Sequence, residues 1–144
     1  MVSNLLKNCK IKQIQNGSAA AQTTVTSSTF AMDGFNAVTI IASLGTVTDG
    51  SVLQLNVQEG AAANGSDAAT ISGAQTPSAT AATSSNTLLV AEALRIVKEY
   101  VTVTLTRTTQ NAGVNCIIAI LHQAANIPVT LDASVLASVL ESGN

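Results

Sequence analysis

The feature that most constrains this chain is the strict alternation of apolar side chains and threonine from Val101 to Thr106. Period-two alternation is typical of an antiparallel β-strand with one face on a core and the other on water or a neighbouring surface. A second segment repeats the pattern, because Leu53, Leu55 and Val57 alternate with amide side chains. The chain is therefore expected to be built from half-buried strands.

Composition restricts the polar surface of these strands to hydroxyl and amide groups. Of the 144 residues, 47% are hydrophobic, 10% are charged and 2% are aromatic. This inventory is poor for catalysis and suits a part that packs into something larger. A chain of this length can bury roughly two-thirds of its unfolded surface, so one independent domain is expected.

Turn signals divide the chain into short strands. Extended segments are expected at residues 9–15, in two pieces within 22–32, and at 37–44, 53–58, 87–93, 100–108 and 114–123. A hairpin signal, Gln110–Gly113, joins the last two segments. Because no long helical pattern interrupts this spacing, the sequence predicts an all-β fold, either an antiparallel β-sandwich or a jelly-roll-like barrel, with terminal arms.

The domain organisation follows from the same reading. Residues 1–8 are expected to be an N-terminal arm and residues 9–127 the β-sandwich domain. Within that domain, residues 60–85 contain almost no large apolar side chain except Ile71, so they are expected to form a long excursion over the surface. Residues 128–144 are expected to be either a C-terminal arm or a short helix.

The two terminal segments carry apolar residues outside the predicted core. Exposed apolar stripes of this kind mark interaction surfaces. The candidate interaction residues are Leu5, Leu6, Leu131, Val135, Leu136 and Val139.

No arrangement of residues indicates catalysis, a cofactor or a metal. His122 is the only histidine, and it ends an apolar strand without a recognisable nucleophile motif, so a hydrogen-bonded structural histidine is expected. The acidic residues are isolated, and Asp33, Asp49 and Asp67 fall in glycine-containing turns. We therefore expect a protein that is not an enzyme, with no catalytic residue, cofactor or metal ligand.

The remaining reactive and charged groups have structural explanations. Cys9 and Cys116 lie on apolar stretches and are expected to be reduced. Lys7, Lys10 and Lys12 form the one basic cluster, which is better explained as a charged strand edge than as a nucleic-acid site. No apolar run has the length of a membrane span, and neither nucleic acid nor membrane is an expected partner.

Four segments together resemble small structural proteins encoded in the head gene clusters of tailed bacteriophages. The similarity spans roughly residues 9 to 125 and rests on β-hairpin punctuation. The segments that carry it are Ala31–Val38 with Leu44 and Gly45, Thr48–Leu53, Val57–Asp67 and Tyr100–Arg107.

The resemblance implies a virion protein, made in the bacterial host cytoplasm, that decorates or cements the capsid surface. Its implied partners are the major capsid protein and further copies of itself, as a homodimer or homotrimer. Two alternatives remain open from the sequence. One is a structural protein of the phage tail, neck or fibre, and the other is a receptor-binding or glycan-binding β-module.

Overall fold

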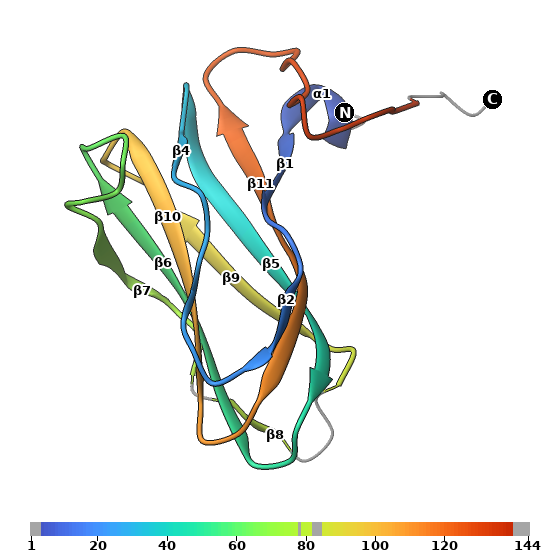
Figure 1. The fold of residues 1–144 in the computed structure, drawn as a ribbon. Coiled ribbons are helices and arrows are strands. Elements are labelled where there is room, and N and C mark those ends of the chain that lie inside the picture. The colour runs from blue at the N-terminus through green and yellow to red at the C-terminus, as the bar shows by residue number, and fades with distance from the viewer. Residues whose placement is uncertain (1–3, 78, 82–84, 140–144) are drawn as a thin grey trace.

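Two antiparallel sheets pack face to face in this computed structural model, which describes residues 4–77, 79–81 and 85–139 (Figure 1). The described residues form eleven strands and one short helix. The elements are α1 (Leu5–Asn8), β1 (Lys10–Gln15), β2 (Ser18–Ala21), β3 (Val25–Thr26), β4 (Phe30–Ala31), β5 (Phe35–Val47), β6 (Ser51–Gly60), β7 (Ala69–Gln75), β8 (Ala79–Ala81), β9 (Leu88–Leu94), β10 (Tyr100–Thr108) and β11 (Ala112–Ala124).

The strands divide into two sheets, here called sheet A and sheet B. Sheet A has the order β1-β11-β5-β9, and β2 continues the edge of β1 by pairing with β11. Sheet B has the order β3-β10-β6-β7, with β4 also on β10 and β8 also on β6. The all-β sandwich that the sequence predicts is confirmed.

The chain crosses from one sheet to the other at two reversals, and these crossings determine how the four longest strands pair. The segment β5–β6 and the segment β10–β11 each leave one sheet and enter the other, so that β5 pairs with β11 and β6 pairs with β10. The prediction of a hairpin at Gln110–Gly113 is therefore wrong: the chain reverses there, but the two strands do not pair with each other. Turn residues specify a reversal, whereas the sheet that each strand joins depends on distant partners.

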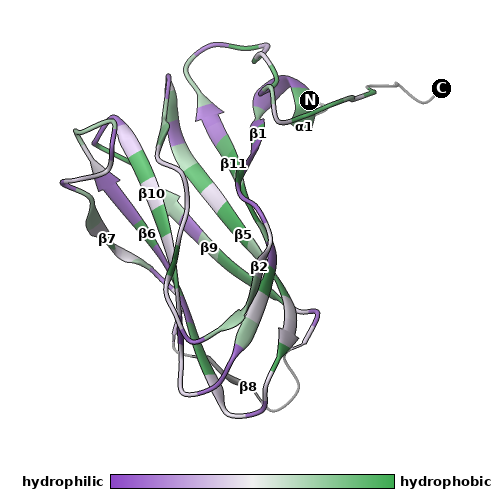
Figure 2. Ribbon diagram, in the orientation of Figure 1, coloured by the Kyte–Doolittle hydropathy of each residue, from purple (hydrophilic) through white to green (hydrophobic). Residues whose placement is uncertain are grey.

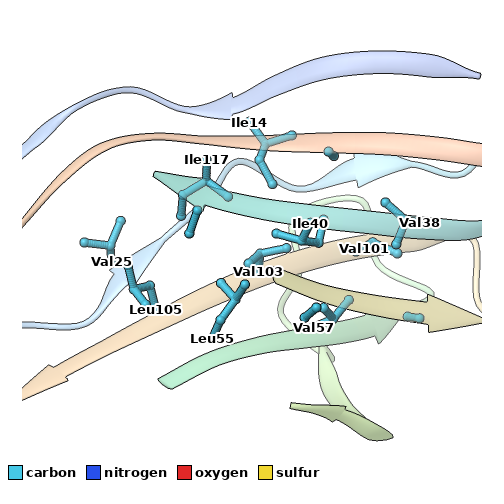
Figure 3. Close-up of a cluster of buried hydrophobic side chains, with 14 of the residues drawn as sticks. Ile14, Val25, Val38, Ile40, Leu55, Val57, Val101, Val103, Leu105 and Ile117 are labelled. Atoms are coloured by element: carbon cyan, nitrogen blue, oxygen red, sulfur yellow. The ribbon is translucent and has the colours of Figure 1, made fainter. Parts of the chain in front are cut away.

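The core lies between the inward faces of the two sheets and is made almost entirely of aliphatic side chains. Figure 3 shows residues such as Ile40 and Ile117 of sheet A pointing toward Val103 and Leu55 of sheet B. The alternation along β5 and β10 is visible in Figure 2 as alternating colours on each ribbon. Burial of such aliphatic side chains contributes about 1.5–3 kcal/mol each, so this layer supplies most of the driving force for folding.

One charged side chain, Arg107 of β10, lies inside this apolar layer with 2% of its surface exposed. Its Nε donates to the carbonyl of Thr23 at 2.7 Å, and Nη1 donates to the carbonyls of Ala19 at 2.9 Å and Ala112 at 2.6 Å. Its Nη2 donates to the hydroxyl of Thr23 at 3.0 Å. Burial lowers the pKa of the guanidinium. The side chain spans from sheet B to β2 and β11 of sheet A.

The long segment of small residues is partly built into sheet B. Within residues 60–85, β7 and β8 both pair with β6, and Ala74 packs into the core. Asp67 closes the preceding loop by accepting the N–H groups of Ala61 at 2.8 Å and Ala62 at 3.0 Å. Residues 78 and 82–84 of this segment lie outside the described residues.

The last part of the chain crosses one end of sheet A as an extended segment. Val129 donates its N–H to the carbonyl of Lys7 at 2.9 Å, and the N–H of Gln13 donates to Ser134 Oγ at 3.1 Å. Residues 128–139 contain no helix, and residues 140–144 lie outside the described part. Asp132, which would favour a helix start, instead closes a turn by accepting the N–H and hydroxyl of Ser134.

Removing the Arg107 side chain should destabilise the fold strongly. Arg107→Ala leaves three carbonyl groups without their donor and opens a cavity, so we expect a loss of about 3 kcal/mol or more in the free energy of unfolding. Urea denaturation followed by circular dichroism measures this. Lys98→Ala removes an exposed cation and is the matched control, expected to leave the midpoint unchanged. An equal effect of both variants would contradict the bridging role of Arg107.

Candidate interaction surface

The outward face of sheet A carries apolar side chains on four neighbouring strands, and among them the polar residues Gln13, Thr39, Ser43, Glu92 and His122. Because β5 and β11 turn alternate residues into the core, their other residues point outward, and the ladder register aligns these in rows across the sheet. One row joins Ile118, Ile41 and Val90, and the next contains Ile11 and Ile120. We call this surface the apolar face; its members are Ile11, Ile41, Leu88, Val90, Leu94, Cys116, Ile118 and Ile120.

Exposure on the apolar face increases toward β9. Ile11, Ile41, Ile118 and Ile120 are half-buried by their neighbours within the sheet. On β9 the outward side chains are more open, with 59% of Leu88, 51% of Val90 and 52% of Leu94 exposed. Exposure of neighbouring aliphatic side chains is costly in water, which makes this surface a candidate for interaction.

The outward face of sheet B has the opposite chemistry. Its central strands present hydroxyl and amide groups, and the register places Thr102 beside Gln58, and Thr104 beside Asn56. Some of these groups bind one another: Asn56 Nδ2 donates to Thr70 Oγ1 at 2.9 Å, and the hydroxyls of Thr29 and Thr102 lie 2.8 Å apart, whereas Asn56 Oδ1 is buried without a partner among the described residues. This face is suited to water, so the molecule has one apolar and one hydrated side.

A small polar cluster interrupts the apolar face near one end. Thr39 Oγ1 donates to Glu92 Oε1 at 3.3 Å, and His122 Nε2 lies 3.1 Å from Thr39 Oγ1 and 3.2 Å from Glu92 Oε1. The expectation of a strand-end histidine with a satisfied hydrogen bond is confirmed. Because the polar groups of the cluster bind one another, this part of the face can be covered at a lower desolvation cost.

The terminal residues named from the sequence gather at one end of the sandwich, where α1 and the final described segment lie side by side (Figure 1). Leu6, Leu131 and Val135 are half-buried. Leu5 is 53% exposed, Leu136 is fully exposed and Val139 is 82% exposed. The structure places α1 and the final described segment beside each other. That these residues contact a partner stays a prediction.

An ion pair attaches the C-terminal segment to β1. Lys12 Nζ lies 3.4 Å from Asp132 Oδ2. Burial alone would raise the pKa of Asp132, but the N–H and hydroxyl of Ser134 and the charge of Lys12 together hold this pKa below its ordinary value. β1 is an edge strand, which confirms the interpretation of its lysines as a charged strand edge.

The other reactive side chains have structural surroundings. Cys9 and Cys116 are free, as expected, and both are half-buried. In the described ranges, no three His, Cys, Asp or Glu side chains gather as a metal site would require. No helix within the described part of the chain has the length and apolar character of a membrane span.

Sequence reasoning missed the apolar face, although a signal for it exists. The run Cys116–Leu121 is apolar at every position, which is typical of a core strand. In a two-layer sandwich one face of such a strand must point outward, so Ile117, Ala119 and Leu121 are buried while Ile118 and Ile120 are half-exposed. An uninterrupted apolar strand in a chain without covering helices is thus itself a sign of a partner.

Comparison with known proteins identifies proteins that are similar to this chain in fold only. The chain matches no protein-family model and no curated protein. It is similar in fold to VP2 in the subviral particle of infectious bursal disease virus, with 12% identity and a TM-score of 0.52 over 85% of this chain and 34% of that chain. The Gx strain of the same virus gives 11% identity and a TM-score of 0.48 over the same shares of each chain.

A pilus subunit is also similar in outline. A Bacillus endospore appendage, from a family of disulfide-linked pili, has 14% identity and a TM-score of 0.44 over 87% of this chain and 96% of that chain. This chain spans about a third of the length of the viral capsid chains that it matches.

Adjacent isoleucines on β11 provide a test of which face is buried. Ile117→Ala should lower the free energy of unfolding by about 2–5 kcal/mol, because it opens a cavity in the core. Ile118→Ala removes the same atoms from the apolar face and should cost well under half as much. Urea denaturation measures both. Equal losses would show that Ile118 is not an outward residue.

The contacts of Asp132 with Ser134 and Lys12 should weaken at low pH. A carboxylate with a lowered pKa stabilises the folded state above the ordinary carboxylate pKa of about 3.9, and this contribution is lost as the pH falls through the lowered value. Attachment of the C-terminal segment should therefore weaken as the pH falls below about 4. The amide NMR signals of Gln13 and Ser134 report it. Asp132→Asn should show weaker attachment throughout and no such transition; an identical transition would assign it to another group.

Proposed function

We propose that this chain is a non-enzymatic structural protein of a virion, bound on the capsid surface of a tailed phage as a decoration or cement protein. The observation that carries the proposal is the opposite chemistry of the two outward faces. The outward face of sheet A carries the apolar side chains that a partner would cover. The outward face of sheet B presents hydroxyl and amide groups to water. A protein that lies flat on a shell needs both sides.

The size of the apolar face favours a partner present in many copies. Four strands spaced at about 4.8 Å, each contributing about seven residues at 3.3 Å, give a footprint on the order of 400 Å². A stable standard interface uses about 800 Å² on each partner, so this face alone gives modest affinity. Repeated binding along a lattice, with added contacts from the terminal segments, supplies the remainder through avidity.

The fold likeness is compatible with this proposal. The VP2 protein forms a viral particle, so a sandwich of this architecture can occur in a viral shell. The more specific assignment to tailed phages and to the role of decoration rests on the resemblance of segments such as Val57–Asp67 and Tyr100–Arg107. The partner in the proposal is the major capsid protein.

The polar cluster on the apolar face supports a binding role rather than chemistry. The polar side chains of the cluster contact one another: Thr39 donates to Glu92, and His122 lies within hydrogen-bond distance of both. A nucleophile relay needs a serine or cysteine beside the histidine. The polar cluster therefore fixes the orientation in which this protein binds its partner.

Capsids of a phage that lacks this gene provide the test. Purified protein is added, unbound material is removed by sedimentation, and bound copies are counted by cryo-EM. The variant Ile41→Asp with Ile118→Asp places two carboxylates on the apolar face and should reduce occupancy at least tenfold, since a buried unpaired charge is costly.

The matched control carries the same charge change on sheet B. Asn56→Asp with Thr104→Asp alters the hydrated face and should retain binding, provided that both proteins show a cooperative unfolding transition. Loss of binding by the sheet B variant alone would overturn the assignment of faces. Copies located only on the tail or neck would replace decoration with the alternative structural role, and binding to a glycan array but not to particles would favour a receptor-binding module.

A further inference from the structure

Strand β9 leaves one edge of sheet A without a partner among the described residues. Its residues pair with β5 on one side, from Leu88 opposite Ser43 to Leu94 opposite Ala37. On the other side, no backbone hydrogen bond engages Leu88–Leu94 within the described part of the chain. Glu92 is the single charged residue of β9, and the strand contains no proline.

Two other sheet edges, at β1 and at β7, are protected. The edge at β1 carries Lys10 and Lys12 and is crossed by the C-terminal segment, which accepts the N–H of Gln13. The edge at β7 is irregular, with a register shift against β6 and a glycine, Gly73, at φ 80°. Charges, bulges and covering segments are the usual means of preventing edge pairing, and β9 has almost none of them.

The space beside β9 admits another strand. A shallow groove of about 210 Å³ runs between the edges of the two sheets, lined by Gly73–Pro77 of sheet B and Val90–Glu92 of sheet A. On the outward face next to this edge, Leu88, Val90 and Leu94 are each more than half exposed. An added strand would complete the hydrogen bonding of β9 and flank these side chains with cross-strand neighbours.

The sequence of β9 is complementary to itself in one antiparallel register. Ala91 is the middle of the seven residues, so a two-fold axis at Ala91 pairs the whole strand. Leu88 then lies opposite Leu94 of the second copy on the outward face, and Val90 lies opposite Glu92. This register separates the two Glu92 carboxylates, whereas an axis at Glu92 would place them directly opposite each other.

We infer that two copies of this chain pair through β9 in the register centred on Ala91, forming a dimer with one sheet A continuous across both subunits. The apolar faces then join on the same side of the dimer, because antiparallel pairing keeps outward residues outward. This doubles the footprint described above. The dimer forms from the isolated protein, so it stands or falls independently of capsid binding.

Opposite charges at Val90 test both the dimer and its register. Val90→Glu places a carboxylate opposite Glu92 of the second copy, twice per dimer, and should raise the dimer dissociation constant roughly five- to tenfold. Val90→Lys places an ammonium there and should leave dimerisation equal or tighter. Sedimentation equilibrium measures the constants, and thermal unfolding confirms that both variants fold.

Cross-linking tests the register without disturbing charge. With Cys9 and Cys116 replaced by serine, Leu88→Cys and Leu94→Cys variants are mixed and treated with a short thiol cross-linker. The mixture should link, whereas each variant alone should not, since like positions lie about 20 Å apart in this register.

Several outcomes would overturn the inference. They are a wild-type monomer at millimolar concentration, equal weakening by Val90→Glu and Val90→Lys, a trimer, and linking of Leu94→Cys to itself. The charge pair separates register-specific pairing from a general effect of added charge, because both variants modify the same exposed position.

Discussion

The guanidinium of Arg107 joins β10 of sheet B to β2 and β11 of sheet A, two strands that no ladder connects to β10. Where β10 leaves sheet B and the chain enters β11 of sheet A, the carbonyls of Ala19, Thr23 and Ala112 turn into the interior, and Arg107 supplies their donors. At this crossing β11 pairs with β5 rather than with β10. That pairing determines which residues of β11 point inward, and therefore creates the apolar face as well as the core.

Much of the fold could be predicted because alternation is a local property. The period-two pattern of Val101–Thr106 predicts β10, and its inward residues are those that the sequence indicates. Edge lysines on β1 and the hydrogen-bonded His122 follow from similarly local reasoning. Each of these predictions depends on residues within one strand and its flanking turns.

What could not be predicted depends on partners distant in the chain. The turn at Gln110–Gly113 has the residues of a hairpin, yet its two strands join different sheets because β5 and β6 pair with them. Arg107 is indistinguishable by sequence from an exposed arginine that ends a strand. The apolar face could not be predicted either, because it forms only when Ile41, Ile118 and Val90 are aligned across three strands.

The closeness of the first and last described segments has a mechanical consequence. α1 and the final described segment meet at the same end of the sandwich, joined by the hydrogen bond from Val129 to Lys7 (Figure 1). A force that pulls these segments apart acts on β1 and β11 from the end where Lys10 faces Leu121. Ladder bonds then open one after another, as in a zipper, instead of resisting together in shear. The pairing of β6 with β10 carries no load until this edge has peeled away, so tension would detach an edge strand while the centre stays folded.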